Sequence, residues 1–174
     1  PIGILLVQTL KAKGASKVMV TDISDYRLEL ALKCGADFAV NTKNEDFGEA
    51  MLRCFGPDKA DIIYDCAGNN ITIDQAIRHS RKGSIIVLVA VFEGMATVDL
   101  ATLNDKELDL NTSMMYRHED YLEAIELVEA GKVSLNPLMS QHFAFKDWEK
   151  AYEYIDNNRE TTMKVLIDLN NDED

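Results

Sequence analysis

Basic residues are scarce in this sequence. Its 174 residues include 18 lysines and arginines against 30 aspartates and glutamates, for a formal net charge of −12. Nucleic acids and anionic membrane surfaces bind proteins through clustered lysine and arginine side chains, and no basic stripe occurs along the chain. The charge balance therefore argues against nucleic acid and anionic lipid as partners.

Long hydrophobic runs are missing as well. The longest apolar stretch, Ile85 to Phe92, is far shorter than the roughly 20 residues that a membrane-spanning helix requires. A short apolar run between turn-forming residues is typical of a parallel strand that is buried on both faces. We therefore expect no membrane partner.

Cysteine and histidine are too few and too scattered to predict a metal site. The cysteines stand at positions 34, 54 and 66, and the histidines at positions 79, 118 and 142. No C-x-x-C pair occurs, and no histidine stands at ligand spacing from a cysteine. An odd number of separated cysteines is typical of reduced thiols inside a cell. We expect no metal ligand in this chain and a cytoplasmic location.

The first 22 residues contain the strongest functional signal. Pro1 suits the first turn of a helix, apolar residues follow at helical spacing, and Gly14 is placed to end that helix. A short β-branched run then leads to Asp22. In a dinucleotide-binding βαβ unit, an acidic residue about 20 positions past the glycines binds the adenosine ribose, and the distance from Gly3 to Asp22 fits. An ordinary amphipathic helix followed by a strand is the alternative interpretation.

Apolar strands and amphipathic helices alternate along the chain. The strands are expected at Ser16 to Val20, Phe38 to Asn41, Ala60 to Cys66, Ser84 to Phe92, Leu108 to Thr112, Ser140 to Ala144 and Lys164 to Leu169. Residues that suit a helix N-cap are Ser24 or Asp25, Asp46 and Asp120. The helix after Asp120 is expected to turn Leu122, Ile125 and Val128 inward. The alternation predicts an α/β fold with an open parallel sheet covered on both faces.

Candidate ligand-binding residues follow from that fold class. Open parallel sheets bind ligands at the carboxyl ends of their strands, near the point where the strand order reverses. Asp22, the segment Cys66 to Gly68 and the segment Val89 to Val91 all stand at such ends. We therefore expect a ligand site there.

Six blocks of sequence, read in order, carry a resemblance to a known family. They are PIGILLVQTLKAKGASKVMVTDIS at the start, RLELALKCGAD from Arg27, DIIYDCAGN from Asp61, KGSIIVLVAV from Lys82, YLEAIELVEAGKV from Tyr121 and FAFKDWEKAYEYI from Phe143. Together they resemble the zinc-containing medium-chain alcohol dehydrogenases, most of all the polyol branch of sorbitol or iditol dehydrogenase, with threonine and butanediol dehydrogenases nearby. The resemblance implies a Rossmann-type doubly wound parallel sheet with its first strand missing, followed by a C-terminal return segment.

The resemblance also implies an NAD site. Its residues would be Pro1, Ile2, Gly3, Asp22, Arg27, Cys66, Ala67, Val89 and Val91. The backbone N–H of Ile2 would face the pyrophosphate at a helix N-terminus, and Gly3 would allow the helix to pack closely on the sheet. Asp22 and Arg27 would hold the adenosine ribose, with the Asp22 charge disfavouring NADP. Cys66 and Ala67 would line the adenine side, and Val89 to Val91 the nicotinamide side.

Two of these assignments have simpler alternatives. Without the resemblance, Arg27 is a solvated charge on a helix and Asp22 is a turn residue. The substrate stays open, because Met115 stands before Tyr116 where the polyol branch often has an arginine.

The resemblance implies a domain plan as well. Residues 1–117 would form an N-terminally truncated NAD-binding domain, and residues 118–170 a helix and return segment that pack on an absent catalytic domain. Residues 171–174 are acidic and expected to be disordered. The zinc ligands of the family lie before the first residue, so zinc is implied for the intact protein only.

The predicted function is the cofactor-binding part of an NAD-dependent, zinc-containing dehydrogenase that oxidises a secondary alcohol or polyol to a ketone. The fragment alone is expected to be inactive. The intact protein is expected to form a homodimer or homotetramer, with Leu108 to Thr112 at the dimer contact. Two alternatives remain open: a non-catalytic module for NAD binding or subunit contact, and another Rossmann enzyme such as a methyltransferase.

Overall fold

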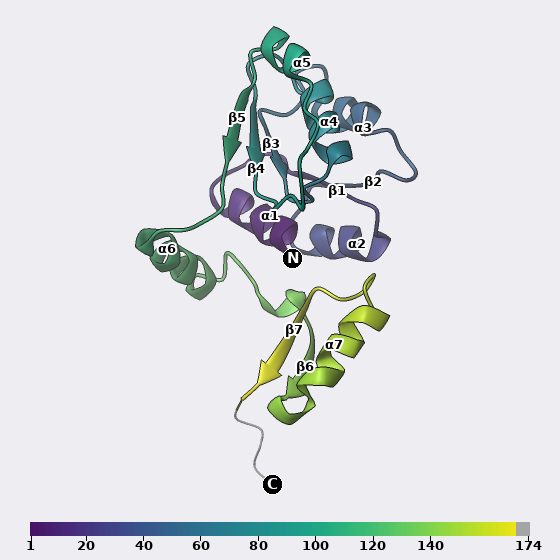
Figure 1. The fold of residues 1–174 in the computed structure, drawn as a ribbon. Coiled ribbons are helices and arrows are strands. Elements are labelled where there is room, and N and C mark those ends of the chain that lie inside the picture. Colours follow the sequence, from purple (N-terminus) through teal and green to yellow (C-terminus); the bar gives the residue numbers. More distant parts are fainter. Residues whose placement is uncertain (170–174) are drawn as a thin grey trace. The chain divides into compact units, whose positions relative to one another are not determined.

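The structure is a computed structural model that describes residues 1–169 (Figure 1). The chain forms two compact units: the first joins Pro1–Asn41 to the residues from Glu123 onward, and the second is Thr42–Leu122. The helices are α1 (Ile2–Ala12), α2 (Asp25–Lys33), α3 (Phe47–Phe55), α4 (Asn70–His79), α5 (Leu100–Asp105), α6 (His118–Glu129) and α7 (Trp148–Asn157), with short 3-10 turns at Asn136–Leu138 and Phe145–Asp147. The strands are β1 (Met19–Asp22), β2 (Phe38–Asn41), β3 (Ile62–Asp65), β4 (Ile85–Leu88), β5 (Asp109–Thr112), β6 (Met139–Ala144) and β7 (Lys164–Asp168).

The first unit begins with a βαβ arrangement. Strands β1 and β2 pair in parallel, with Asp22 opposite Asn41 at their carboxyl ends, and α2 packs against both strands. Ser24 caps α2, because its side chain accepts a hydrogen bond from the Arg27 N–H. That capping residue was one of the two predicted from the sequence.

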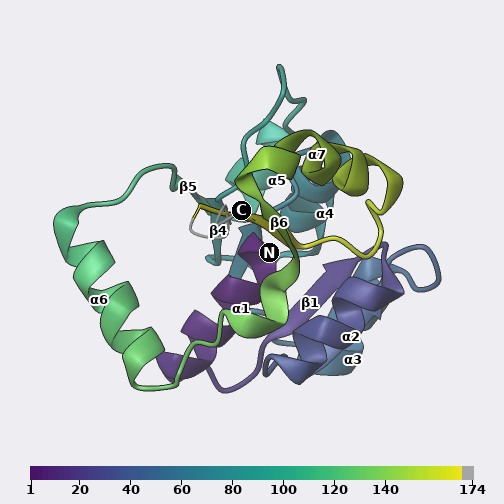
Figure 2. The same ribbon diagram turned by 90° about the horizontal axis from the view of Figure 1, so that it is seen from below.

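The C-terminal segment returns to this first part of the chain. The side chain of Gln8, which is 6% exposed, accepts from the Ser134 N–H at 2.7 Å and donates to the Ser134 carbonyl at 3.1 Å. Leu138 and Met163 join the buried cluster that contains Ile4. Figure 2 shows this segment passing beside α1, and Figure 1 shows α7 beside the parallel pair of β6 and β7. The return segment therefore shares a hydrophobic core with α1.

The second unit contains a three-stranded parallel sheet in the order β3-β4-β5. Ile73 and Ile77 of α4 pack with Ile86 of β4 in its buried core. Asp46 caps α3 by accepting from the Glu49 N–H, as predicted. Asn69 begins α4 with a reciprocal capping box that involves Thr72.

The strand orders identify the fold class. A doubly wound dinucleotide-binding sheet has the order 3-2-1-4-5-6. The pair of β2 and β1 has the order of strands 3-2, and β3-β4-β5 has the order of strands 4-5-6. No strand among residues 1–169 takes the position of strand 1. The predicted Rossmann-type parallel α/β class with its first strand missing is confirmed.

Two local predictions were wrong. Helix α6 begins at His118, and Asp120 is its third residue, where the carboxylate accepts from the Arg117 N–H at 2.7 Å. Leu122, Ile125 and Val128 are 49%, 53% and 38% exposed rather than inward-facing. Helical spacing indicates which side chains share a face, but burial also requires a covering element, and each of these three side chains stays more than a third exposed.

The length of β4 was overestimated, and one helix was missed. Strand β4 ends at Leu88, whereas the apolar run suggested Phe92, and Val91 is 67% exposed. The short helix α5 is capped by Asp99 and was not among the elements expected from the sequence. The domain boundary at residue 117 stays a prediction, and the predicted disorder of residues 171–174 lies outside the described residues.

Within residues 1–169, no helix has the length and apolar character to cross a membrane.

Candidate cofactor site

Asp22 ends β1, and its side chain, 28% exposed, lies over the turn into α2. Its Oδ1 atom accepts from the Ile23 N–H at 2.7 Å and from the Ser24 N–H at 2.9 Å. No contact is described for Oδ2 with any of residues 1–169. Asp22 is thus bonded to the turn through its Oδ1 atom.

Arg27 lies beside Asp22 and is held by the return segment. Its Nη1 atom is 3.8 Å from Asp22 Oδ1, and Nη2 donates to the carbonyl of Arg159 at 3.1 Å. The Ser24 hydroxyl donates to the carbonyl of Glu160 at 3.3 Å. The Nε atom of Arg27 is buried with no hydrogen-bond partner among the described residues. Arg27 is therefore positioned by the protein rather than free in solvent.

The first three residues lie at the start of α1. Pro1 occupies the N-cap position, and Ile2 is 52% exposed. A Cβ atom added at Gly3 would meet no described atom within 4 Å. The expected close packing at Gly3 is therefore not seen in the part of the chain that the structure describes.

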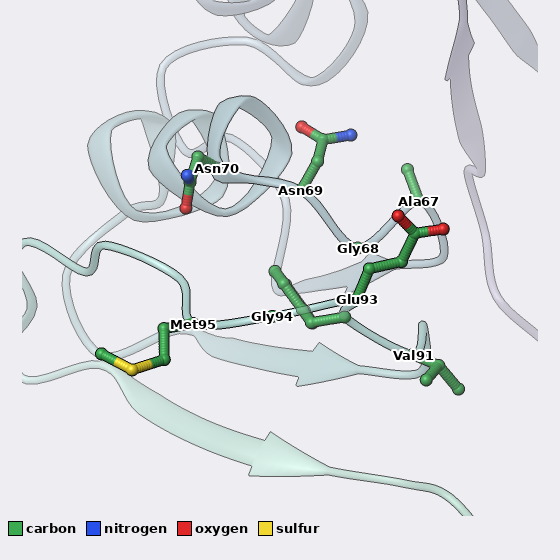
Figure 3. Close-up of a pocket in the computed structure, with 9 residues that line it drawn as sticks. Ala67, Gly68, Asn69, Asn70, Val91, Glu93, Gly94 and Met95 are labelled. Atoms are coloured by element: carbon green, nitrogen blue, oxygen red, sulfur yellow. The ribbon is translucent and has the colours of Figure 1, made fainter.

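A pocket of about 380 Å³ lies within the second unit (Figure 3). Its walls are the loop from β3 to α4 and the segment after β4; the lining residues are Ala67, Gly68, Asn69, Asn70, Val91, Phe92, Glu93, Gly94 and Met95. Figure 3 shows the Glu93 side chain directed toward Ala67. Asn70 joins the walls, because its Oδ1 accepts from the Thr97 N–H at 2.9 Å. Two predicted segments, after β3 and after β4, thus line one pocket.

The individual predicted residues differ in their places around this pocket. Ala67 and Val91 line it, whereas Cys66 and Val89 do not. The Val89 N–H donates to the main-chain carbonyl of Asp65 at 2.9 Å. Burial raises the pKa of the Cys66 thiol, and the neighbouring Asp65 carboxylate raises it further. The Cys66 thiol is therefore a weaker acid than an ordinary cysteine thiol.

Asp65, which sequence reasoning did not single out, is 4% exposed. Its Oδ1 accepts from the Ala67 and Gly68 N–H groups at 2.9 and 3.0 Å, and its Oδ2 accepts from the Thr72 hydroxyl at 3.0 Å. An acidic residue at the end of an apolar strand, three positions before a glycine, is the signal that could have identified it.

No group of three or more histidine, cysteine, aspartate or glutamate residues within 1–169 is arranged to hold a metal ion.

Comparison with known proteins identifies the family. Residues 1–130 match the family model described as zinc-binding dehydrogenase. Sorbitol dehydrogenase 1 of Saccharomyces cerevisiae is 31% identical over 173 residues, which cover 96% of this chain and 48% of that protein. The (R,R)-butanediol dehydrogenase of Neisseria gonorrhoeae is 30% identical, covering 98% of this chain and 48% of that protein.

Solved structures agree with this assignment. L-idonate 5-dehydrogenase of Escherichia coli superposes with a TM-score of 0.86 at 27% identity, covering 97% of this chain and 47% of that one. A short chain alcohol dehydrogenase of Escherichia coli, complexed with cofactor NADH, gives a TM-score of 0.87 at 26% identity, covering 97% and 50%. The chain thus spans about half the length of the curated relatives it matches. This chain belongs to the zinc-binding dehydrogenase family.

Proposed function

We propose that the protein containing this chain is an NAD-dependent, zinc-containing dehydrogenase that oxidises a secondary alcohol or polyol to a ketone. The chain supplies the cofactor-binding part of that enzyme. The observation that carries the proposal is the Asp22 carboxylate at the carboxyl end of β1. Its Oδ1 is engaged by the following turn, whereas its Oδ2 has no described partner and can accept from ribose hydroxyls.

The other predicted residues are also proposed to contact NAD, each within its own unit of the chain. Arg27 lies beside Asp22 and contacts the same ribose. Helix α1 presents the N–H of Ile2 to the pyrophosphate, since helix N-termini attract anions. Ala67 and Val91 line a pocket whose size suits part of a dinucleotide, and Cys66 and Val89 are close to them in sequence. When bound, NAD accepts the hydride, and the residues of this chain bind and orient it.

Zinc is proposed for the intact protein and not for this chain. The described residues contain no cluster that fits a metal ion, so no zinc ligand and no catalytic step is assigned to them. The alcohol and polyol substrates of the relatives named above support the substrate class.

Cytoplasmic location is part of the proposal, because Cys34 and Cys66 are free thiols and reduced thiols suit that compartment.

A homodimer formed through β5 is also proposed. Strand β5 is at the edge of its sheet, and all four of its residues are exposed. An open edge offers unpaired N–H and C=O groups to a second copy. This edge is also the observation that favours the non-catalytic alternative, a subunit-contact module. Light scattering after size exclusion measures the oligomeric state directly, and a monomer at micromolar concentration would contradict the dimer.

The cofactor assignment is tested by replacing Asp22. Asp22→Ala should lower the preference for NAD over NADP by about ten- to a hundredfold, because it removes a charged hydrogen-bond acceptor and its repulsion of the 2′-phosphate. Isothermal titration of the wild-type and variant proteins with NADH and NADPH measures the ratio. Asp25→Ala removes a neighbouring carboxylate that bonds to Asn41 instead and serves as the control. An unchanged ratio in Asp22→Ala would contradict the role of Asp22.

The reaction is tested on the protein that contains this chain. Sorbitol, 2,3-butanediol and threonine are offered with NAD, and NADH formation is followed by absorbance. We expect at least one of these three alcohols to be oxidised, and we expect a chelator to abolish that activity. Turnover that survives the chelator would contradict the zinc assignment, and binding of NADH without turnover of any alcohol would favour the non-catalytic module.

A further inference from the structure

Asp65 joins the two walls of the pocket in the second unit. Its side chain accepts from the N–H groups of Ala67 and Gly68, which belong to the wall before α4. Its main-chain carbonyl accepts from the N–H groups of Val89 and Ala90 at 2.9 and 3.0 Å, which lead into the wall after β4. A single residue therefore fixes both walls by four hydrogen bonds.

The same carboxylate is closed to a ligand. Asp65 is 4% exposed, and both oxygens have partners, since Oδ2 accepts from the Thr72 hydroxyl at 3.0 Å. Thr72 in turn belongs to the capping box that starts α4 together with Asn69. Buried polar networks in which every member has a partner hold one geometry firmly. Asp65 thus acts on the loop and not directly on whatever fills the pocket.

The walls also approach each other closely where Asp65 holds them. A Cβ atom added to Gly68 would lie 2.8 Å from the Ala90 Cβ and 3.1 Å from the Val91 carbonyl oxygen. Gly68 has a φ of +71°, a conformation that glycine adopts without strain. Its N–H is one of the two bonded to Asp65. The hydrogen bond and the close approach together define the shape of the loop that lines the pocket.

We propose that Asp65 is a positioning residue for dinucleotide binding: it shapes the loop from Cys66 to Asn69 so that the pocket accepts the cofactor. This inference rests on the proposed function, because the ligand is taken to be NAD. It adds a residue that is neither exposed to the pocket nor part of the predicted contact set. The essential property is the hydrogen-bonding geometry of the side chain rather than its charge.

Asn in place of Asp65 separates geometry from charge. Its amide oxygen can accept from Ala67 and Gly68, and its NH₂ group can donate to the Thr72 oxygen, which still has the Asn69 carbonyl as its own acceptor at 3.1 Å. Asp65→Ala removes all three side-chain bonds. Asp74→Ala makes the same truncation at an exposed ion pair on α4 and is the matched control.

Two measurements on the 174-residue chain test the proposal. Amide hydrogen exchange is expected to speed up about tenfold at Ala67 and Gly68 in Asp65→Ala, and to stay near wild type in Asp65→Asn and Asp74→Ala. The dissociation constant for NADH is expected to rise about tenfold in Asp65→Ala and to change by less than about threefold in the other two variants. A variant that is merely less stable would speed exchange throughout the unit instead of at this loop.

The possible outcomes are separable. Unchanged exchange at Ala67 and Gly68 in Asp65→Ala overturns the positioning role, whatever the cofactor does. Faster exchange with unchanged NADH affinity overturns the link to the cofactor. If the wild type binds no NADH, the proposed function fails for this chain, while the exchange result still decides whether Asp65 orders the loop.

A second pair of variants covers the case in which Asp65→Ala does not fold. Thr72→Val removes the partner of Asp65 Oδ2 together with the capping-box bond from the Asn69 N–H, whereas Thr72→Ser keeps the hydroxyl and both bonds. Exchange at Gly68 and the NADH dissociation constant should both rise about threefold in Thr72→Val and stay at wild-type values in Thr72→Ser. Equal behaviour of the two variants would overturn the proposal.

Discussion

Two aspartates, Asp22 and Asp65, end parallel strands in different units, and both accept hydrogen bonds from the backbone that follows. They differ in exposure and in how many of their carboxylate oxygens have hydrogen-bond partners. The Asp22 side chain is 28% exposed and engages the turn through one oxygen, whereas Asp65 is 4% exposed and uses both oxygens. The first carboxylate has one oxygen with no described partner among residues 1–169, and the second has none. Residue type and position at a strand end therefore do not tell a half-engaged carboxylate from a fully engaged one.

The two loops also differ in what holds them. The loop after β3 is fixed by partners two, three and seven residues from Asp65. The loop after β1 is tied through Ser24 and Arg27 to carbonyls 136 and 132 positions away in the return segment. Hydrogen bonds between residues close in sequence form as soon as the strand and helix form. Those between residues far apart in sequence require the whole unit to assemble. Variants in the two loops should therefore have different effects.

The largest effect is expected at Gly68. Gly68→Ala places a Cβ 2.8 Å from Ala90 and forces alanine into a left-handed conformation, so the second unit should lose about 2–5 kcal/mol of stability. Gly83→Ala is the matched control, because Gly83 has the same φ of +71° but no described atom within 4 Å of the added carbon. That variant should lose only about 1–2 kcal/mol. Urea unfolding followed by far-UV circular dichroism measures both, and equal losses would contradict the close approach of the two pocket walls.

Much of the fold could be predicted from the sequence, because its signals are local. The N-caps at Ser24 and Asp46 were identified from side chains that bond to the nearest backbone N–H groups. The strand ends that carry Asp22 and the pocket loop followed from alternating patterns. The contact of Arg27 with Arg159 could not be predicted, since a backbone carbonyl 132 positions away leaves no mark in composition or spacing.

Errors arose where a pattern depends on a distant partner. The apolar face of α6 has helical spacing, yet Ile125 is 53% exposed, since burial requires an element to cover that face. Asp65 was missed because the sequence does not show whether an acidic residue at a strand end is exposed to a ligand or buried against its own loop. Its burial depends on how the β3–α4 loop folds over it.

A smaller effect is expected at Ser24. Ser24→Ala removes both the N-cap of α2 and the link to the Glu160 carbonyl, and should destabilise the first unit by about 0.5–2 kcal/mol. Ser24→Thr keeps a hydroxyl that can serve both contacts and should remain near wild type. The chain has one tryptophan, Trp148, which begins α7 in this unit, so its fluorescence during urea unfolding measures the change. A Thr variant as unstable as the Ala variant would contradict the assignment of both contacts to the hydroxyl.

The smallest effect concerns Asp37, a third carboxylate that combines features of the other two. Its side chain is 33% exposed, but its oxygens accept from Lys11 Nζ at 3.2 and 3.0 Å and from the Val18 N–H at 2.7 Å. The hydrogen bond from Lys11, followed by that from Val18, holds the pKa of Asp37 below its ordinary value. A lowered pKa stabilises the folded state above the unfolded pKa, and that stability is lost as the pH falls through the folded pKa.

Asp37→Asn removes the charge and keeps an oxygen for Val18. At pH 7 the variant should be less stable than wild type by under about 1 kcal/mol, because the ion pair with Lys11 is partly exposed. As the pH falls through the folded pKa of Asp37, the wild type takes on a neutral group there as well, and the difference should shrink toward zero. Trp148 fluorescence during urea unfolding at pH 7 and at a series of lower pH values measures it, with Glu29→Gln at an exposed position of α2 as the control. A difference that persists unchanged in acid would mean that shape, not charge, is what Asp37 contributes, which would group it with Asp65.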